Sequence, residues 1–398
     1  MTDKEDGSVR FVNYFDGGKL VRKDIYAVLG FLSQRQMHDP ATGENTHAEF
    51  YRPDGTVALR ETYEIVDGAN SLKSMELVDR DGTVREVFGT RQEATAYWVM
   101  RLIAGEKGTC FLVGDRSRRY LHLCRKMGQS EEFSHVHVLH QIHNMHVLSP
   151  YDPMSSRTEA RCRFLHDSGI KSDCVVVLTQ RQKEHIEERY GSGNPIETIP
   201  HALHGKAAPA MAADPFKIVL AGRLHGQKGH DKALEAFRMV LQKVPKAVLH
   251  LYGTGPSEKK IREWVKSEGL GQSVVFEGFC PNMPEVFASS ALSICTSVYE
   301  GFSLVVQESL QNGCPVVSFD CNYGPADMIE DGKNGYLVEQ GDIASLADRM
   351  VRILQDEALR RKMSAYARES VRKFSPSLVV RQWAKIFLEI MQKDEVVS

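Results

Sequence analysis

The stretch ALSICTSVYEGFSLVVQESLQNG, residues 291–313, places a strand, a loop and a helix in immediate succession. ALSICTS is apolar enough for a buried strand, whereas SLVVQES predicts a helix that begins at Ser303 or Leu304 and ends at Gly313. Units of this kind build parallel sheets, whose ligands bind beyond the carboxyl ends of the strands. Because Glu300 and Glu308 flank this turn, the strand end is a candidate site.

The sequence around this stretch continues the same alternation. Apolar segments that predict strands are separated by helical segments, and they are FKIVLAGR, AVLHLYG, VVFEGF, CPVVSFD and GYLVE. The chain ends in long helical segments, from IASLADRMVRIL to SLVVRQWAKIFLEIMQ. We therefore predict a Rossmann-like, doubly wound α/β domain over residues 209–398.

The N-terminal half predicts two further regions. Residues 1–92 contain short alternating segments separated by Asp-Gly pairs, which is typical of hairpins, so we expect an antiparallel β-rich meander. Residues 93–208 alternate between helical and apolar segments and predict an abridged Rossmann-like domain. The Ala- and Pro-rich segment 205–216 suits either an interdomain linker or a plain surface loop.

Composition narrows the class of protein. The formal net charge of −2 over 398 residues gives no global basic field, so we expect no nucleic-acid partner. No apolar run approaches the roughly 20 residues that span a bilayer, and the start MTDKEDGSVRF has no apolar signal segment. The 8 cysteines are scattered without a CxxC pair. This pattern favours free thiols in a reducing cytoplasm, and we expect a cytoplasmic protein.

Two short motifs follow predicted strands and carry candidate anion ligands. AGRLHGQKG, residues 221–229, places Arg223 and Lys228 at the carboxyl edge of the sheet, where anions bind. The alternative is a solvated basic loop. YGTGP, residues 252–256, makes Gly253 a candidate nucleotide contact, although a structural turn is the better explanation of a single GxG.

The opening stretch supplies complementary groups. The first backbone N–H groups of its helix, from Ser303 and Leu304 onward, are unpaired and lie at the positive end of the helix dipole, so they suit a phosphate. Carboxylates are poor phosphate ligands, and the two acids are therefore expected to accept hydrogen bonds from hydroxyls. Glu308 suits a ribose and Glu300 a sugar, whereas two surface acids would be the simpler alternative.

These motifs together resemble the donor site of family-4 retaining glycosyltransferases of the GT-B fold. The resemblance covers roughly residues 216–340 and includes GCPVVSFD and DGKNGYLVE. It implies that Arg223 and Lys228 hold a nucleotide diphosphate and that Glu308 holds the ribose. It also implies that Glu300 and the amides of Gly301 and Phe302 hold the transferred sugar. The two cations and the helix dipole stabilise the leaving diphosphate, so no metal or other cofactor is expected.

A second resemblance narrows the branch. The segments FYRPDGT and RETYE in the meander, followed by LHQIH, VVVLTQRQKEHI and IPHAL, are similar to the bacterial teichoic-acid glycosyltransferases, which include poly(glycerol-phosphate) α-glucosyltransferases. That group also contains the glycosyltransferases of serine-rich adhesins. The resemblance implies UDP-glucose or UDP-N-acetylglucosamine as the donor. The implied acceptor is a polyol phosphate polymer, with a Ser/Thr-rich protein as the alternative.

The histidine-rich segment HVHVLHQIHNMH, residues 135–146, suggests zinc, but alternate residues of a strand point to opposite faces. The family has an active-site histidine in the loop after this strand. His140 is the first candidate for that catalytic role and His143 the second.

The acceptor domain departs from the family pattern. A strand and a Gly-rich loop are expected before the β-rich insert, but the insert comes almost at once, and later strand candidates cover only 109–114, 134–140, 174–178 and 196–199. Either the chain is shortened or the missing layer comes from elsewhere. A non-catalytic partner subunit is therefore a further alternative. The β-rich segment would hold the acceptor or mediate homo-oligomer formation, and its mixed charges favour assembly.

Overall fold

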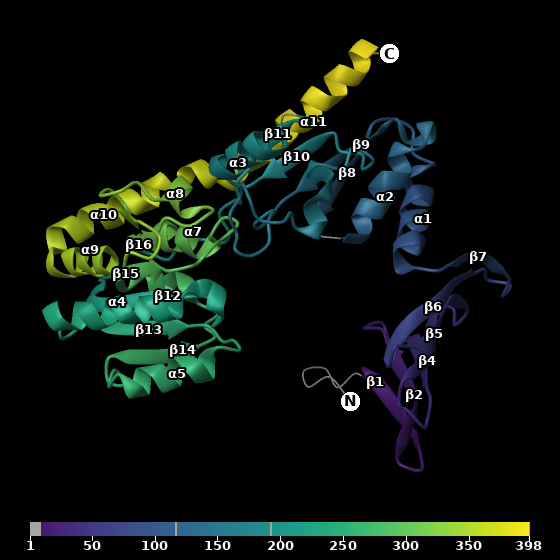
Figure 1. Ribbon diagram of the computed structural model, residues 1–398, viewed down its shortest axis with the longest axis horizontal. Helices are drawn as coiled ribbons and strands as arrows, with labels where there is room; N and C mark the ends of the chain where they lie inside the picture. Colours follow the sequence, from purple (N-terminus) through teal and green to yellow (C-terminus); the bar gives the residue numbers. More distant parts are fainter. Residues whose placement is uncertain (1–8, 116–117, 192, 398) are drawn as a thin grey trace. The chain divides into compact units, whose positions relative to one another are not determined.

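The computed structural model describes residues 9–115, 118–191 and 193–397 (Figure 1). The chain divides into two compact units, residues 1–110 with 117–135 and residues 111–116 with 136–398. This division differs from the predicted domain boundaries after residues 92 and 208. Those boundaries remain a prediction. Residues 1–8 of the predicted β-rich segment lie outside the described residues.

The first unit contains an antiparallel sheet in which every strand pairs with its neighbour in the chain, in the order β1-β2-β3-β4-β5-β6-β7. The strands are β1 (Phe11–Asp16), β2 (Lys19–Tyr26), β3 (Leu32–His38), β4 (Asn45–Tyr51), β5 (Val57–Val66), β6 (Ala69–Val78) and β7 (Val84–Phe88). Asp67 and Gly68 connect β5 to β6 with φ angles of 51° and 75°. Such positive values match the twist of a two-residue hairpin, and the predicted meander is confirmed.

Two helices follow this sheet in the same unit, α1 (Arg91–Ile103) and α2 (Arg118–Gly128), and a short 3₁₀ turn η1 (Glu131–Phe133) comes after them. Thr90 caps α1 in a capping box with Glu93, in which each side chain bonds the other residue's backbone N–H. Helix α1 is also bound to the sheet, because two guanidinium nitrogens of Arg91 donate to the two carboxylate oxygens of the buried Glu61 in β5.

The second unit contains a parallel sheet in the order β11-β10-β9-β8. Its strands, β8 (Cys110–Asp115), β9 (Val136–Gln141), β10 (Cys174–Val177) and β11 (Ile196–Thr198), lie close to the predicted ones. The connections contain η2 (Ala160–Leu165) and α3 (Gln180–Tyr190). The C-terminal helix α11 (Pro376–Val397) packs Val379 and Ile386 against Leu139 and Val176 of this sheet.

A larger parallel sheet follows, in the order β14-β13-β12-β15-β16-β17. Its strands are β12 (Asp214–Ala221), β13 (Val248–Tyr252), β14 (Val274–Gly278), β15 (Ser290–Cys295), β16 (Val316–Phe319) and β17 (Gly335–Val338). The order reverses between β12 and β15, so the loops that leave these two strands diverge from a common point. Ligands of open parallel sheets bind at such a switch point, and both predicted donor motifs follow these strands.

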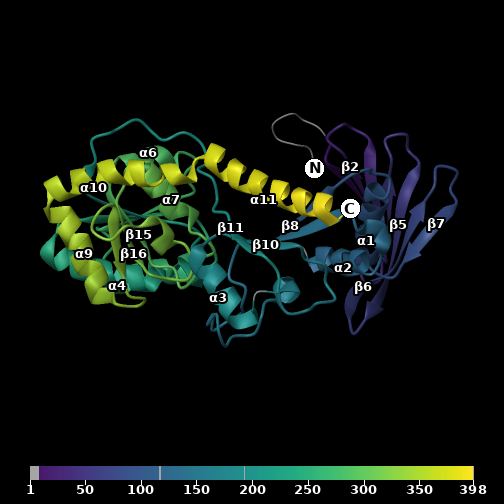
Figure 2. The ribbon, with the colours of Figure 1, turned by 90° about the horizontal axis from the view of Figure 1, so that it is seen from above.

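Helices cover both faces of this sheet (Figure 2). They are α4 (His230–Lys243), α5 (Glu258–Ser267), α6 (Met283–Ala288), α7 (Leu304–Gln311), α8 (Pro325–Met328), α9 (Ile343–Gln355) and α10 (Glu357–Ser370), with the 3₁₀ turns η3 (Gly226–Lys228) and η4 (Arg372–Phe374). Ile218 of β12 packs in one core with Phe237, whereas the next residue, Val219, packs in another with Phe287. Burial on both faces explains why these strands are continuous apolar runs.

The segment predicted as a linker is attached to this domain. The backbone N–H of Ala208 donates to the Asn312 side chain at 2.8 Å, and its carbonyl accepts from Arg368 at 3.2 Å. Residues around 208 are therefore fixed at the end of α7. None of the helices in the described residues has the length and apolar character needed to cross a bilayer.

Candidate donor site at the switch point

The loop after β12 is held against the loop after β15 by backbone contacts. The Thr296 hydroxyl donates to the Lys228 carbonyl at 2.9 Å, and the Val298 N–H donates to the Gln227 carbonyl at 2.8 Å. Gly229 has a φ of 61°, and a Cβ there would lie 2.1 Å from the Thr296 carbonyl oxygen. Only glycine allows this close approach, so Gly229 lets the two loops that carry the predicted motifs contact each other.

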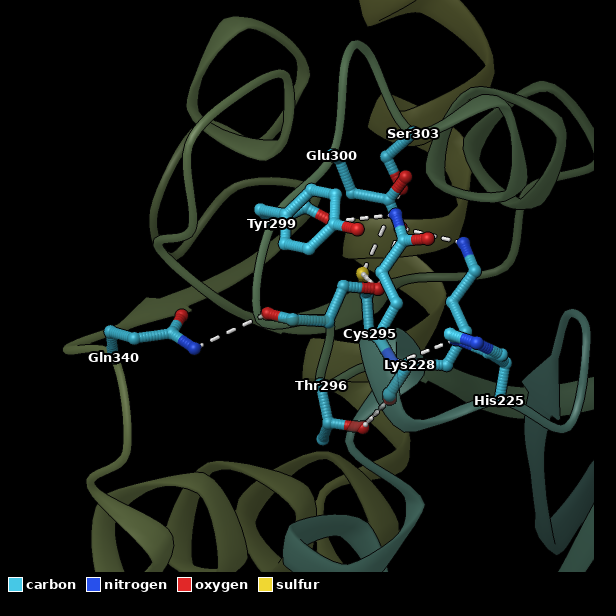
Figure 3. A network of polar contacts seen from close by, with 10 residues as sticks. His225, Lys228, Cys295, Thr296, Tyr299, Glu300, Ser303 and Gln340 are labelled. Carbon is cyan, nitrogen blue, oxygen red and sulfur yellow. Dashed lines mark hydrogen bonds and ion pairs between the residues drawn. The ribbon is translucent and has the colours of Figure 1, made fainter. Parts of the chain in front are cut away.

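Lys228 and Glu300 form the centre of the site (Figure 3). The Lys228 Nζ lies 2.6 Å from Glu300 Oε1, and the Ser297 hydroxyl donates to the same oxygen at 2.6 Å. Glu300 is only 7% exposed. A buried carboxylate needs a partner of opposite charge, and Lys228, 72 residues away in the sequence, supplies it.

The backbone on either side of Glu300 is equally constrained. The Glu300 N–H donates to the Asn322 carbonyl at 2.7 Å, and its own carbonyl accepts from Tyr323 at 2.8 Å. A Cβ on Gly301 would lie 2.0 Å from the His143 carbonyl oxygen. Glycine at 301 therefore lets the loop after β9 approach the loop after β15 in the second unit.

Helix α7 begins directly after this loop with an uncapped first turn. Ser303 is the N-cap residue with a φ of 68°, and its side chain makes no capping hydrogen bond. Leu304, the first helical residue, is exposed, and Phe302 is buried beside it. The N–H groups of the first turn are therefore available for a phosphate, as the sequence predicts.

Glu308 and Arg223 lie on the borders of the site. Glu308 is half-buried in α7, and burial raises the pKa of its carboxyl while nearby His204 opposes that shift. Arg223 is exposed, and within the described residues its side chain makes no ion pair or hydrogen bond. It lies near Tyr299, whose pKa is raised to about 12 by burial and by a hydrogen bond with Tyr151, against the effect of Arg223.

Gly253 supports the Arg223 loop through its backbone. Its N–H donates to the Gly278 carbonyl at 2.7 Å, and a Cβ there would lie 2.0 Å from the Gly222 carbonyl oxygen. The Leu224 N–H in turn donates to Thr254 at 3.0 Å. These contacts favour the structural reading of YGTGP, and a nucleotide contact at Gly253 remains a proposal.

His140 and His143 occupy different surroundings. His140 is 1% exposed, stacks on Phe164 with ring centroids 3.9 Å apart, and contacts the Lys171 carbonyl through Nε2 at 3.0 Å. Burial lowers the pKa of His140 to about 4. His143, in contrast, borders Gly301, and its Nε2 lies 2.7 Å from Asp115 Oδ1. The structure therefore brings His143, and not His140, to the site.

Sequence reasoning missed several residues here. His201, in the loop after β11, stacks on His143 at 5.3 Å between ring centroids and meets the edge of Phe302 at 5.6 Å. The rings of Tyr151 and Tyr299, the residue before Glu300, contact each other at a tilt of 34° with centroids 3.9 Å apart. The available signal was position, because His201 follows a predicted strand of the same sheet as His143.

The zinc alternative for residues 135–146 finds no support in the side-chain arrangement. His137 contacts Asp394 at 2.8 Å, whereas His140 points to the Lys171 carbonyl. Across the described ranges, no three His, Cys, Asp or Glu side chains are grouped to hold a metal ion.

The chain is similar in sequence to a protein family and to individual bacterial glycosyltransferases. Residues 206–370 match the family "Glycosyl transferases group 1". The Bacillus subtilis poly(glycerol-phosphate) alpha-glucosyltransferase is 26% identical over 95% of this chain and 55% of its own length. The Streptococcus gordonii GtfA subunit of a UDP-N-acetylglucosamine–peptide N-acetylglucosaminyltransferase is 24% identical over 98% of this chain and 76% of its own length.

Among solved structures, a point mutant of S. aureus TarM, in complex with fondaparinux, alpha-GlcNAc-glycerol and UDP, superimposes with a TM-score of 0.79 at 22% identity. That likeness covers 95% of this chain and 73% of TarM, and it shows the fold. The chain spans about half the length of the Bacillus subtilis relative. Residues 206–370, which contain both strand-end motifs, therefore match the group 1 glycosyltransferases, and the chain that carries them has the GT-B fold.

Proposed function

We propose that this chain is a retaining glycosyltransferase that moves glucose or N-acetylglucosamine from a UDP-sugar to a hydroxyl of a teichoic-acid-type polyol phosphate polymer. The observation that carries the proposal is the contact between Lys228 and Glu300 at 2.6 Å, directly before the uncapped start of α7. One point thus offers a cation, backbone donors and a carboxylate. These are the groups that a diphosphate and a sugar require.

The diphosphate and the ribose of the donor bind different residues of this site. Arg223, Lys228 and the first N–H groups of α7, at Ser303 and Leu304, bind the diphosphate and stabilise its charge as it leaves. Glu308 accepts from the ribose hydroxyls, which satisfies a carboxylate whose pKa burial raises.

Glu300 and the amides of Gly301 and Phe302 hold the transferred sugar. His143 takes the catalytic role first assigned to His140, because its backbone already contacts the Gly301 position. In the retaining reaction the acceptor hydroxyl attacks the face from which UDP leaves. Its proton passes to a phosphate oxygen of the leaving group. No metal ion is included in this scheme.

The proposed identity of the acceptor is based on the proteins to which this chain is similar. The Bacillus subtilis relative is named for poly(glycerol-phosphate), and TarM was solved with alpha-GlcNAc-glycerol, which supports a polyol phosphate. The second candidate is a Ser/Thr-rich protein acceptor, which similarity to the GtfA subunit over nearly all of this chain favours. That subunit also keeps open a partner role for this chain beside a sister enzyme. The cytoplasm, where UDP-sugars are made, is the proposed location.

A transfer assay tests the proposal. The chain is incubated with UDP-glucose or UDP-N-acetylglucosamine and with either a synthetic glycerol phosphate oligomer or a Ser-rich peptide, and products are read by mass spectrometry. We expect transfer of glucose or N-acetylglucosamine to the oligomer and full activity in EDTA. Transfer to the peptide alone would replace the acceptor, and activity restored only by added metal would overturn the metal-free mechanism. No UDP binding by calorimetry at millimolar concentration would reject the donor site.

A further inference from the structure

Ser297 lies just beyond the end of β15 and makes a contact that the donor motifs do not explain. Its side chain is buried, at 2% exposure, and its hydroxyl donates to Glu300 Oε1 at 2.6 Å. Lys228 contacts the same oxygen (Figure 3). Within the described part of the chain, the other oxygen, Oε2, has no hydrogen-bond donor. The carboxylate is therefore held by one oxygen and presents the other.

The orientation of the Ser297 hydroxyl is itself determined by a neighbour. The buried Cys295 thiol lies 3.7 Å from Ser297 Oγ and donates to it, and its sulfur also contacts Ser303 Oγ at 3.7 Å. A hydroxyl carries one hydrogen, so an oxygen that accepts from the thiol directs that hydrogen to Glu300. The Ser297 carbonyl also accepts from Gln340 at 3.3 Å. Both the backbone and the side chain of Ser297 are thereby fixed.

Lys228 and Ser297 differ in what a ligand can take from them. Lys228 is a flexible point charge with three donors and 16% side-chain exposure, so an incoming anion can recruit its ammonium. Ser297 is enclosed, and its hydrogen faces only Glu300. When Lys228 turns toward a diphosphate, Ser297 is the contact that remains on Oε1.

We infer that Ser297 is a positioning residue, which holds Glu300 toward the transferred sugar while Lys228 serves the diphosphate. The inference rests on the proposed function, because it needs a nucleotide sugar in this site. It specifies that Ser297 contributes to recognition of the sugar and not of UDP. Cys295 acts behind it by orienting the hydroxyl.

Calorimetry with UDP and with the UDP-sugar that the transfer assay identifies separates these contributions. The measured quantity is the ratio of the two dissociation constants, UDP-sugar over UDP. We expect Ser297→Ala to raise this ratio about tenfold, as loss of a hydrogen bond to a charged group does, with UDP affinity changed by less than about threefold. The matched control is Ser293→Ala in β15, the strand that precedes Ser297. Ser293 is equally buried, at 2%, and its hydroxyl contacts Ser309 at 2.6 Å, away from Glu300.

The outcomes are distinguishable. Failure of the unmodified chain to bind any UDP-sugar rejects the proposed function, whereas binding that Ser297→Ala leaves unchanged overturns the inference alone. An equal ratio in the Ser297 and Ser293 variants would show a merely structural role and also overturn it. If Ser297→Ala does not fold, Cys295→Ala replaces it, with an expected rise in the ratio of about threefold because a thiol is a weak donor. An unchanged ratio in that variant would equally count against the inference.

Discussion

Two buried glutamates, one in each unit, are paired with a basic side chain in different ways. Glu61 in β5 is 2% exposed, and Arg91 contacts both of its oxygens at 2.8 Å, with the Tyr63 hydroxyl on Oε2. Glu300 beyond β15 is 7% exposed, and both of its donors, Lys228 and Ser297, meet on Oε1.

The difference separates a structural carboxylate from a binding one. The planar guanidinium of Arg91 matches both oxygens of Glu61 and closes the pair. A lysine is a point charge that satisfies one oxygen and can move, so Glu300 stays open to a ligand. Burial and an ion pair are common to both glutamates, and the distribution of donors between the two oxygens distinguishes them.

The closed pair predicts the largest loss of stability. Arg91→Ala removes the guanidinium that contacts both oxygens of the buried Glu61 carboxylate, and we expect the unfolding free energy to fall by about 3 kcal/mol, at the low end for buried pairs because Arg91 is partly exposed. Urea denaturation measures this change. Arg85→Ala removes an exposed pair with Asp79 and should cost below about 1 kcal/mol. Similar losses of unfolding free energy in the two variants would mean that the pair of Arg91 and Glu61 does not stabilise the fold more than an exposed ion pair does.

The open pair predicts a loss of affinity instead. Lys228→Ala removes a charge-assisted contact to the diphosphate, and UDP binding should weaken by about 2 kcal/mol, or roughly 30-fold. Lys243→Ala, at the far end of α4 and exposed, is the control and should bind UDP normally. Unchanged UDP affinity in the Lys228 variant, measured by calorimetry, would remove that residue from the site.

The strand-end residues of the site could be predicted from the sequence because the strands of a sheet buried on both faces are continuous apolar runs. Arg223, Lys228 and Glu300 each follow such a run, and the topology brings the ends of β12 and β15 together. The contacts of Ser297 and Thr296 could not be predicted, because each depends on an atom of a residue distant in the chain or on the fold of the loop.

The choice between His140 and His143 could not be made from the alternation of side chains along a strand. Strand β9 continues to Gln141, and Val136 to His140 are all buried, so alternation along the strand does not separate a core face from an open one. His140 therefore looks like a strand-end residue in sequence but lies within the packed sheet. His143 lies past the strand, in the loop that meets Gly301.

The buried state of His140 predicts a pH dependence of stability. Its pKa is about 4 in the folded chain, against 6.5 for an ordinary histidine, because burial disfavours the charged form. The unfolded chain therefore binds more protons between these values, and stability is lost as pH falls from about 6.5 to 4, by up to about 1.4 kcal/mol per pH unit. His140→Leu should flatten this slope in denaturation measured across that range. A slope that does not change would indicate that folding does not lower the pKa of His140.

The starts of α1 and α7 extend the same contrast to helix ends and predict the smallest effect. Thr90 and Glu93 close the first turn of α1 with reciprocal hydrogen bonds, whereas the Ser303 side chain makes none at the start of α7. Thr90→Ala should therefore cost about 1 kcal/mol of unfolding free energy. Ser303→Ala should cost less, about 0.5 kcal/mol, since it loses only a weak contact with the Cys295 thiol at 3.7 Å and no capping bond, and alanine meets the same positive φ. Urea denaturation of both variants measures the difference, and equal losses would show that Ser303 caps α7 in solution and that its first turn is not kept open for a phosphate.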